Sequence, residues 1–367
     1  MALSEAQRLP ASHGARLAFA DGIRGIAALW VVLFHASKGG HVDHLKAVLP
    51  EWFNRVVFDW GHLGVALFFV LSGFVMMHTV RGYAFSAGFG GRFLLRRLLR
   101  LTPPYHASIA FVLGYVALKS ALHHQPAPLP SGSVVLAHAF YLQDILSLES
   151  LSVVYWTLGI EIQFYIAFAL LMLAQHHAAL RWRISGAAPM LLGAAAIVGL
   201  PWAFDLVSTP LYRGGFLSFW YCFMLGVLVS AQDHDAALAK PFFAYVGLVA
   251  AAALVTGSGF AWASLGAVLL IYGGGRSARV ARLLNLRALQ YLGLISYSLY
   301  LTHNQVTGAI KFALARVVGP TAAGELLGLA MILVACLAFA TLGHRWVERP
   351  SIAWSRRVSF KQRAAVA

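Results

Sequence analysis

The chain has 367 residues, of which 60% are hydrophobic and only 11% are charged. This composition lies outside the range of soluble globular domains and indicates an integral membrane protein. The formal net charge of +15 is typical of basic loops that face an anionic membrane surface. Because the charge forms no separate basic domain, we expect no nucleic-acid partner. The two cysteines, Cys222 and Cys336, fall in apolar segments and are interpreted as packing residues.

Continuous apolar stretches, each close to the roughly 20 residues that a membrane-spanning helix needs, recur along the whole sequence. Ten spans are predicted, at 18–37, 61–80, 104–122, 155–174, 187–204, 215–231, 241–257, 259–275, 289–310 and 323–343. The strand-type alternation of a barrel is missing. The sequence therefore predicts an all-α, polytopic membrane bundle of about ten helices that forms a single domain over residues 1–367.

The basic residues predict the orientation of this bundle. With the N-terminus inside, 21 of the 28 lysines and arginines fall in cytoplasmic loops and tails. We expect both termini to be cytoplasmic, with a short N-terminal segment at 1–17 and a basic tail at 346–367. The polar start lacks a small-residue cleavage site, so the first span is interpreted as retained and not as a signal peptide.

The first span carries two residues that lipid disfavours. Arg24 lies near its start and His35 follows eleven residues later, so both fall on one helix face about 16 Å apart along the axis. We expect them to face the same cavity at different depths, with Asp21 capping the helix and pairing with Arg24. The alternative is that Arg24 snorkels to the headgroups and His35 anchors the other end.

A basic segment, GGRFLLRRLLRLTPPY at 90–105, precedes the third span. Arg97 and Arg100 are three residues apart, so they project from the same side of a short helix that Pro103 and Pro104 are expected to end. Two guanidinium groups held together suit a polyanion such as a phosphate group. The alternative is an amphipathic segment that rests on anionic lipid.

Glu161 is the only carboxylate deep in a predicted span, within VVYWTLGIEIQFYIAF at 153–168. An unpaired charge there would be costly, so it needs a partner. Tyr165, four residues on, and an arginine or histidine from another helix are candidates, and Trp156 falls on a nearby face. A structural interhelical contact and a direct catalytic role both remain open.

Polar residues also mark the span YLGLISYSLYLTHNQV at 291–306. Ser296, Tyr300 and His303 recur at steps of four and three residues, which places them on one helix face. Such a stripe either joins neighbouring helices or lines a wet cavity.

These segments together resemble the acyltransferase-3 family of membrane acyltransferases over nearly the whole chain. The resemblance is carried by Arg24 with His35 after DGIRG, FFVLSGFV at 68–75, RRLLRLTPPY at 96–105, YWTLGIEIQFY at 155–165, SYSLYLTH at 296–303 and WVERP at 346–350. Ala20 and Ile23 stand where leucines are common in the family, and Thr157 replaces a frequent serine. None of these departures removes a polar functional group.

The resemblance implies an O-acyltransferase of the bacterial inner membrane that moves an acyl group, usually acetyl from acetyl-CoA, to a hydroxyl of an envelope carbohydrate. Arg24, Arg97 and Arg100 are then expected to bind the acyl-CoA at a cytoplasmic mouth. His35 would be a general base or an acyl-accepting residue, supported by Arg24 and by Glu161, which could fix the imidazole tautomer or hold an arginine.

The acceptor or the oxyanion is expected to be bound by Trp156, Tyr165, Tyr297, Tyr300 and His303. No metal is expected, and the sequence indicates neither the acceptor nor the oligomeric state. A secondary transporter or flippase for a sugar or anionic substrate is the main alternative, although paired broken half-helices are not evident. A third is a non-catalytic partner in polysaccharide assembly.

Overall fold

The structure is a computed structural model that describes residues 17–122, 124, 126, 129–182, 187–207, 214–314 and 319–360. Residues 1–16 of the expected N-terminal segment and residues 361–367 of the expected tail lie outside these ranges. Within them the chain is helical and contains no strand, which confirms the all-α class.

Among the described residues, seven elements precede α7. They are α1 (Ala18–Lys38), α2 (Asp43–Val48), α3 (Glu51–Val57), η1 (Asp59–Leu63), α4 (Gly64–Val80), α5 (Ala87–Leu122) and α6 (Gly132–Ala139). Next come α7 (Trp156–Trp182), α8 (Ala187–Ile197), α9 (Leu200–Ala203), η2 (Phe216–Phe219) and α10 (Trp220–Ala231). The last group is η3 (Ala236–Leu238), α11 (Ala239–Thr256), α12 (Gly259–Arg276), α13 (Ala278–Leu284), α14 (Arg287–Leu314), α15 (Ala322–Gly343), η4 (His344–Glu348) and α16 (Arg349–Arg357).

Each of the ten expected spans coincides with helix in the structure. Among the described residues, six helical segments are long and apolar enough to cross a membrane: Ala18–Lys38, Glu51–Val80, Ala87–Leu122, Trp156–Arg181, Ala236–Thr256 and Ala322–Arg357. Two more apolar helices, Met190–Ala203 and Phe216–Ala231, are shorter. The other two expected spans, α12 and α14, are helical but carry glycines or polar residues that lower their hydropathy. The chain is therefore a polytopic helical membrane protein.

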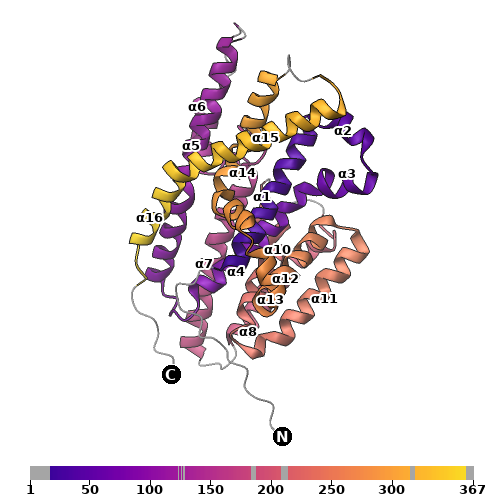
Figure 1. Cartoon of the computed structure of the whole chain (residues 1–367). Helices are drawn as coiled ribbons and strands as arrows, with labels where there is room; N and C mark the ends of the chain where they lie inside the picture. Colours follow the sequence, from indigo (N-terminus) through magenta and orange to yellow (C-terminus); the bar gives the residue numbers. More distant parts are fainter. Residues whose placement is uncertain are drawn as a thin grey trace.

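Helix α1 packs most extensively on α14, and glycines make this contact possible. A Cβ atom on Gly25 would lie 2.6 Å from the Leu289 carbonyl oxygen of α14, and one on Gly293 would lie 2.0 Å from that of Asp21. Close backbone approach through small residues is a common way to join helices in membranes. It places the Asp21 turn of α1 directly against α14, and Figure 1 shows the two helices beside one another.

Helices α4 and α10 form a second close contact, in which each supplies a glycine to the other. A Cβ on Gly73 would lie 2.0 Å from the Phe223 carbonyl oxygen, and one on Gly226 would lie 1.9 Å from that of Val70. All of α10 is buried in this part of the bundle. The two glycine contacts together hold α1, α4, α10 and α14 around the interior of the protein.

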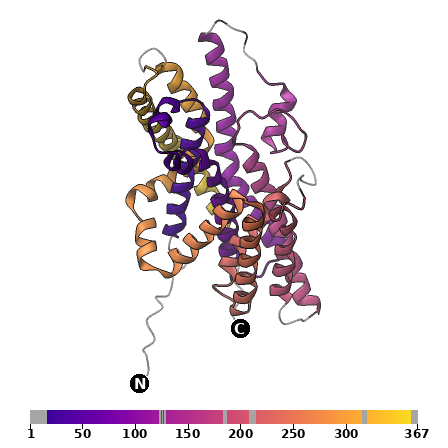
Figure 2. The same cartoon turned by 90° about the vertical axis from the view of Figure 1, so that its right-hand side faces the viewer.

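Helix α5 differs from the expectation that Pro103 and Pro104 end a short helix before the third span. It runs unbroken from Ala87 to Leu122 with both prolines inside it, and Figure 2 shows it as a tall helix that extends past its neighbours. Prolines are tolerated in membrane helices where other segments supply polar contacts to the backbone. The prolines leave the Leu99 and Arg100 carbonyls without their helical donors, and the Tyr297 hydroxyl donates to the adjacent Leu101 carbonyl oxygen at 2.8 Å.

The segment expected to form a basic tail is also part of the bundle. Helix α15 continues through the π-helical turn η4 into α16, and in Figure 1 this long element crosses the molecule diagonally. Helix α16 packs on α5, and Glu348 in η4 is only 4% exposed. The start of α1 and the end of α16 approach the same cavity, so both ends of the described chain lie at one end of the bundle.

Candidate active site

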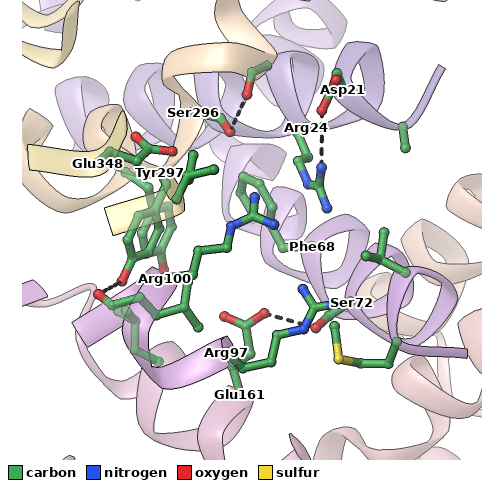
Figure 3. A pocket seen from close by; sticks show the side chains of 18 of the residues that line it. Asp21, Arg24, Phe68, Ser72, Arg97, Arg100, Glu161, Ser296, Tyr297 and Glu348 are labelled. Atoms are coloured by element: carbon green, nitrogen blue, oxygen red, sulfur yellow. Dashed lines mark hydrogen bonds and ion pairs between the residues drawn. The ribbon is translucent and has the colours of Figure 1, made fainter. Parts of the chain in front are cut away.

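A cavity of about 600 Å³ lies inside the bundle, which is an ordinary size for a ligand site. Its walls come from α1, α4, α5, α7, α14 and the η4–α16 segment, so residues far apart in sequence meet there (Figure 3). Seven of the candidate site residues line it: Arg24, Arg97, Arg100, Glu161, Tyr165, Tyr297 and Tyr300. His35, Trp156 and His303 are not among the lining residues that the structure describes.

Arg24 enters this cavity from α1. Its Nη1 atom lies 3.1 Å from Oδ1 of Asp21, one helical turn earlier, as the spacing predicts. Both side chains are largely shielded from solvent. Asp21 neutralises part of the guanidinium charge within the membrane-facing bundle, while the tight contact at Gly22 and Gly293 holds this turn of α1 in place.

Arg97 and Arg100 enter the cavity from one face of α5, and Figure 3 shows their guanidinium groups directed into the same space as that of Arg24. The Nη2 atom of Arg97 donates to the Thr79 hydroxyl on α4 at 2.9 Å. Among the described residues, no hydrogen bond or ion pair engages the guanidinium of Arg100. Its donors are therefore free to bind an anion that enters the cavity.

Glu161 meets two hydroxyl groups and not the arginine or histidine partner that the sequence suggested. Ser72 of α4 donates to Oε1 of Glu161 at 2.9 Å, and the Tyr165 hydroxyl donates to the same oxygen. The contact with Tyr165 follows from the four-residue spacing, whereas Ser72 comes from another helix. The described ion pairs do not include Glu161, although Figure 3 shows it beside Arg97.

The tyrosines of α14 form another part of the cavity wall. Tyr297 reaches Leu101 on α5, as described above, and the Tyr300 hydroxyl lies 2.8 Å from Oγ1 of Thr157 on α7. Thr157, where the family often has serine, keeps this contact. Trp156 instead packs with Phe69 and Phe219, at centroid distances of 6.4 and 5.5 Å, so it supports the wall from outside.

His35 and His303 lie beyond the Tyr300 end of the cavity. Tyr300 is the last lining residue on α14, and its ring lies 6.1 Å from that of His303 and 5.7 Å from that of Phe68. His303 in turn contacts His35. The expectation that Arg24 and His35 share one cavity thus differs from the structure: Arg24 lines the cavity, whereas His35 is joined to its lining through His303 and the ring of Tyr300.

Sequence reasoning gave no role to several polar residues of the lining. Glu348 accepts from the Ser298 hydroxyl at 2.7 Å and lies 3.3 Å from Nδ1 of His344. Ser72, His78 and Arg356 complete the polar lining. The motifs FFVLSGFV and WVERP contain Ser72 and Glu348, so the sequence carries a signal for both, but the apolar run ends at residue 343 and predicts a tail where the structure continues as helix.

The balance of charges favours an anionic ligand. Four arginines, Arg24, Arg97, Arg100 and Arg356, face three carboxylates, and the guanidinium of Arg100 has no partner among the described residues. The described residues contain no group of three or more His, Cys, Asp or Glu side chains placed to hold a metal ion. The cavity is therefore suited to a phosphate-bearing molecule held by guanidinium groups.

The fold and the cavity define a polytopic helical membrane protein with an internal, arginine-lined binding site. Sequence comparison then identifies it: residues 17–344 match the family described as an acyltransferase domain, acyltransferase-3. The chain belongs to the acyltransferase-3 family and is an acyltransferase.

One curated relative is similar over a limited part of the chain. It is described as protein 2 in the picA locus of Rhizobium radiobacter, and it is 35% identical over 101 residues. These residues make up 27% of this chain and 46% of that protein, so the match spans less than half of the relative. No solved structure matches the chain.

Proposed function

We propose that this acyltransferase is an O-acyltransferase that takes an acyl group, acetyl in the simplest case, from cytosolic acyl-CoA and transfers it to a hydroxyl of an envelope or exported carbohydrate. The observation that carries the proposal is the arginine-lined cavity inside a membrane bundle of this family. Coenzyme A is a polyanion on a slender arm, and Arg24, Arg97 and Arg100 supply the matching cations. The bacterial inner membrane is the proposed location.

We infer the orientation of the acyl-CoA donor from the residues that lie at one end of the cavity. The start of α1 and the exposed Arg356 of α16 mark one end of it, which the distribution of basic residues assigns to the cytoplasm. The phosphates of the coenzyme would be held there by the arginines, and the arm would extend toward Tyr300 and Phe68. The thioester would then lie next to the ring of Tyr300, which contacts His303 and through it His35.

The chemical step requires one base. An acceptor hydroxyl oxygen attacks the thioester carbon while its proton passes to the imidazole of His35, and the C–S bond then breaks. The thiolate of coenzyme A leaves and recovers the proton from the imidazolium, so an O-acyl product and a free thiol result. Attack by His35 itself, with an acyl-histidine intermediate, uses the same residue as nucleophile.

The remaining residues have supporting roles in this proposal. The hydroxyls of Tyr297 and Tyr300 lie in the cavity wall and would stabilise the developing oxyanion by exchanging their present partners, Leu101 and Thr157. Glu161, held by Ser72 and Tyr165, balances the charge of Arg97. His35 is half-buried near the end of α1 opposite Arg24, so the acceptor would approach it from the external side of the membrane.

The proposal is tested by incubating the purified full chain with radiolabelled acetyl-CoA and a panel of carbohydrates. We expect thiol release coupled to a labelled product. His35→Ala should abolish transfer while the protein still folds in detergent, and His177→Ala, a histidine on α7 away from the cavity, should retain full activity. A His35→Ala variant that keeps most of its turnover would overturn the role of His35.

The same experiment separates the transferase from a carrier. A transporter or flippase with this cavity would release no thiol and would instead move substrate across sealed vesicles that contain the protein. Substrate flux without thiol release would overturn the proposed function. Thiol release and labelled product that both depend on His35 would support it.

A further inference from the structure

His35 and His303 are in direct contact, although they lie on different helices and 268 residues apart. Nε2 of His303 lies 3.2 Å from Nδ1 of His35, and the two rings are 5.0 Å apart at 53°. His303 is fully buried on α14, whereas His35 on α1 is only partly buried. The contact therefore joins a fully buried imidazole to a partly exposed one.

The backbone around His303 determines which of its nitrogens carries the proton. Its Nδ1 atom lies 3.1 Å from the carbonyl oxygen of Leu299 and 2.9 Å from that of Tyr300. A carbonyl oxygen only accepts, so Nδ1 must be the N–H donor, and in the neutral ring Nε2 then offers a lone pair. That lone pair faces His35.

The same argument applies to His35. Its Nδ1 atom lies 3.0 Å from the Val31 carbonyl oxygen and 3.2 Å from Nε2 of His303, both of which are acceptors. A proton on Nδ1 satisfies this arrangement, whereas the opposite tautomer would turn a lone pair toward two other lone pairs. With the proton on Nδ1, the remaining nitrogen, Nε2, is unprotonated and can act as a base.

We infer that His303 is a positioning residue, which holds His35 as the Nδ1–H tautomer so that Nε2 of His35 can accept the proton of the acceptor hydroxyl. The inference rests on the proposed function, and it replaces the expectation that His303 binds the acceptor. The arrangement has the logic of a nucleophile–histidine–carboxylate triad, with a neutral imidazole in place of the carboxylate.

The use of a neutral group here has a physical reason. The rings of Phe34 and Tyr300 pack against the two histidines, at centroid distances of 5.1 and 6.1 Å. A carboxylate would be costly in such surroundings, whereas a neutral imidazole is not. When His35 takes up the proton, the Nδ1–H bond to His303 remains and stabilises the transient imidazolium ion.

The tautomer can be measured without any reaction. In full-length protein labelled with ¹⁵N-histidine in detergent, we expect His35 to show Nδ1 protonated and Nε2 unprotonated, with its signals assigned by their loss in His35→Gln. His138 is an internal standard, because its Nδ1 faces the Val134 carbonyl oxygen and its Nε2 accepts from the Leu151 N–H. A wild-type His35 that carries its proton on Nε2 alone would overturn the inference.

Variants of His303 then test the positioning role. In His303→Leu the Val31 carbonyl oxygen remains as an acceptor for Nδ1 of His35, so we expect a larger fraction of the Nε2–H tautomer than in wild type. We also expect a kcat that falls about 10- to 100-fold, with an unchanged KM for acyl-CoA. His303→Gln places an amide oxygen near the position of Nε2 and should restore most of the lost rate. His138→Gln, which alters another fully buried histidine, is the matched control and should leave kcat unchanged.

The outcomes separate this inference from the proposed function. An unchanged tautomer and kcat in His303→Leu, or a loss that His303→Gln does not rescue, would show a merely structural histidine and overturn the inference. If the His35 tautomer depends on His303 but the protein transfers no acyl group, the proposed function is contradicted. The inferred effect of His303 on the tautomer of His35 would still hold.

Discussion

At the residue scale, Arg97 and Arg100 are the side chains whose removal most directly tests the donor site. Each offers charge-assisted hydrogen bonds, which contribute about 1.5–3 kcal/mol to an anionic ligand. We therefore expect Arg97→Ala and Arg100→Ala to raise the KM for acyl-CoA roughly 10- to 100-fold, with a smaller change in kcat.

Arg96→Ala is the matched control for these variants. Arg96 is the neighbour of Arg97 on α5, but its guanidinium lies over the Phe360 ring at 4.8 Å and does not line the cavity. We expect it to leave the KM for acyl-CoA unchanged in the same steady-state assay. If coenzyme A binds equally well to wild type, Arg97→Ala and Arg100→Ala, the site of the phosphates lies elsewhere.

A second prediction concerns the shared oxygen of Glu161. Because Ser72 and Tyr165 both donate to Oε1, removing one hydroxyl changes what the other contributes. Ser72→Ala and Tyr165→Phe should each lower the free energy of unfolding by about 1–3 kcal/mol. Their double-mutant cycle should show a coupling of at least about 0.5 kcal/mol, measured by thermal unfolding in detergent.

The control for this cycle pairs Ser72→Ala with Tyr245→Phe. Tyr245 of α11 donates to the Ala196 carbonyl oxygen and shares no partner with Ser72. These two changes should add without coupling. Additive effects of Ser72→Ala and Tyr165→Phe would mean that the two hydroxyls do not act on one carboxylate.

At the element scale, the contact between α1 and α14 decides where Arg24 points. A methyl group at Gly293 would overlap the Asp21 backbone, so Gly293→Ala must push the two helices apart. Overpacking of this kind costs about 1–3 kcal/mol, and it should lower the melting temperature and raise the KM for acyl-CoA together. Gly247→Ala on α11, where a Cβ meets nothing within 4 Å, should do neither.

The continuity of α5 has a related consequence. Arg97 and Arg100 precede Pro103 and Pro104, yet they belong to the same helix as Tyr105 and Ile109 in the buried core. Their guanidinium groups are therefore anchored by a long helix and not by a surface segment lying on lipid. This favours a defined binding site over a non-specific attraction to anionic headgroups.

At the scale of the whole molecule, the proposed function needs a donor side and an acceptor side. The two native cysteines are buried, so they leave a low background for thiol labelling. We expect Trp52→Cys on α3, 67% exposed in the wild type, to react with an impermeant maleimide in right-side-out vesicles. Arg279→Cys on the exposed face of α13 should react only in inside-out vesicles. The reverse labelling pattern would mean that the protein has the opposite orientation, with Arg24, Arg97 and Arg100 on the external side of the membrane.

Local spacing explains how much of the site the sequence could predict. The contacts of Asp21 with Arg24 and of Glu161 with Tyr165 join residues three or four apart, so helical geometry alone requires them. The common face of Arg97 and Arg100 has the same origin. Apolar stretches of membrane length likewise predict helices, since a backbone in lipid must satisfy its own hydrogen bonds.

Contacts between helices could not be predicted in this way. Ser72 reaches Glu161, Glu348 reaches Ser298 and His303 reaches His35 only because particular helices are neighbours. The sequence by itself determined the helical membrane class, the family and the residues on each helix face. The tertiary structure alone decided which faces meet, because neighbouring helices are selected by close packing at glycines such as Gly22, Gly73 and Gly293, and not by the period of any single helix.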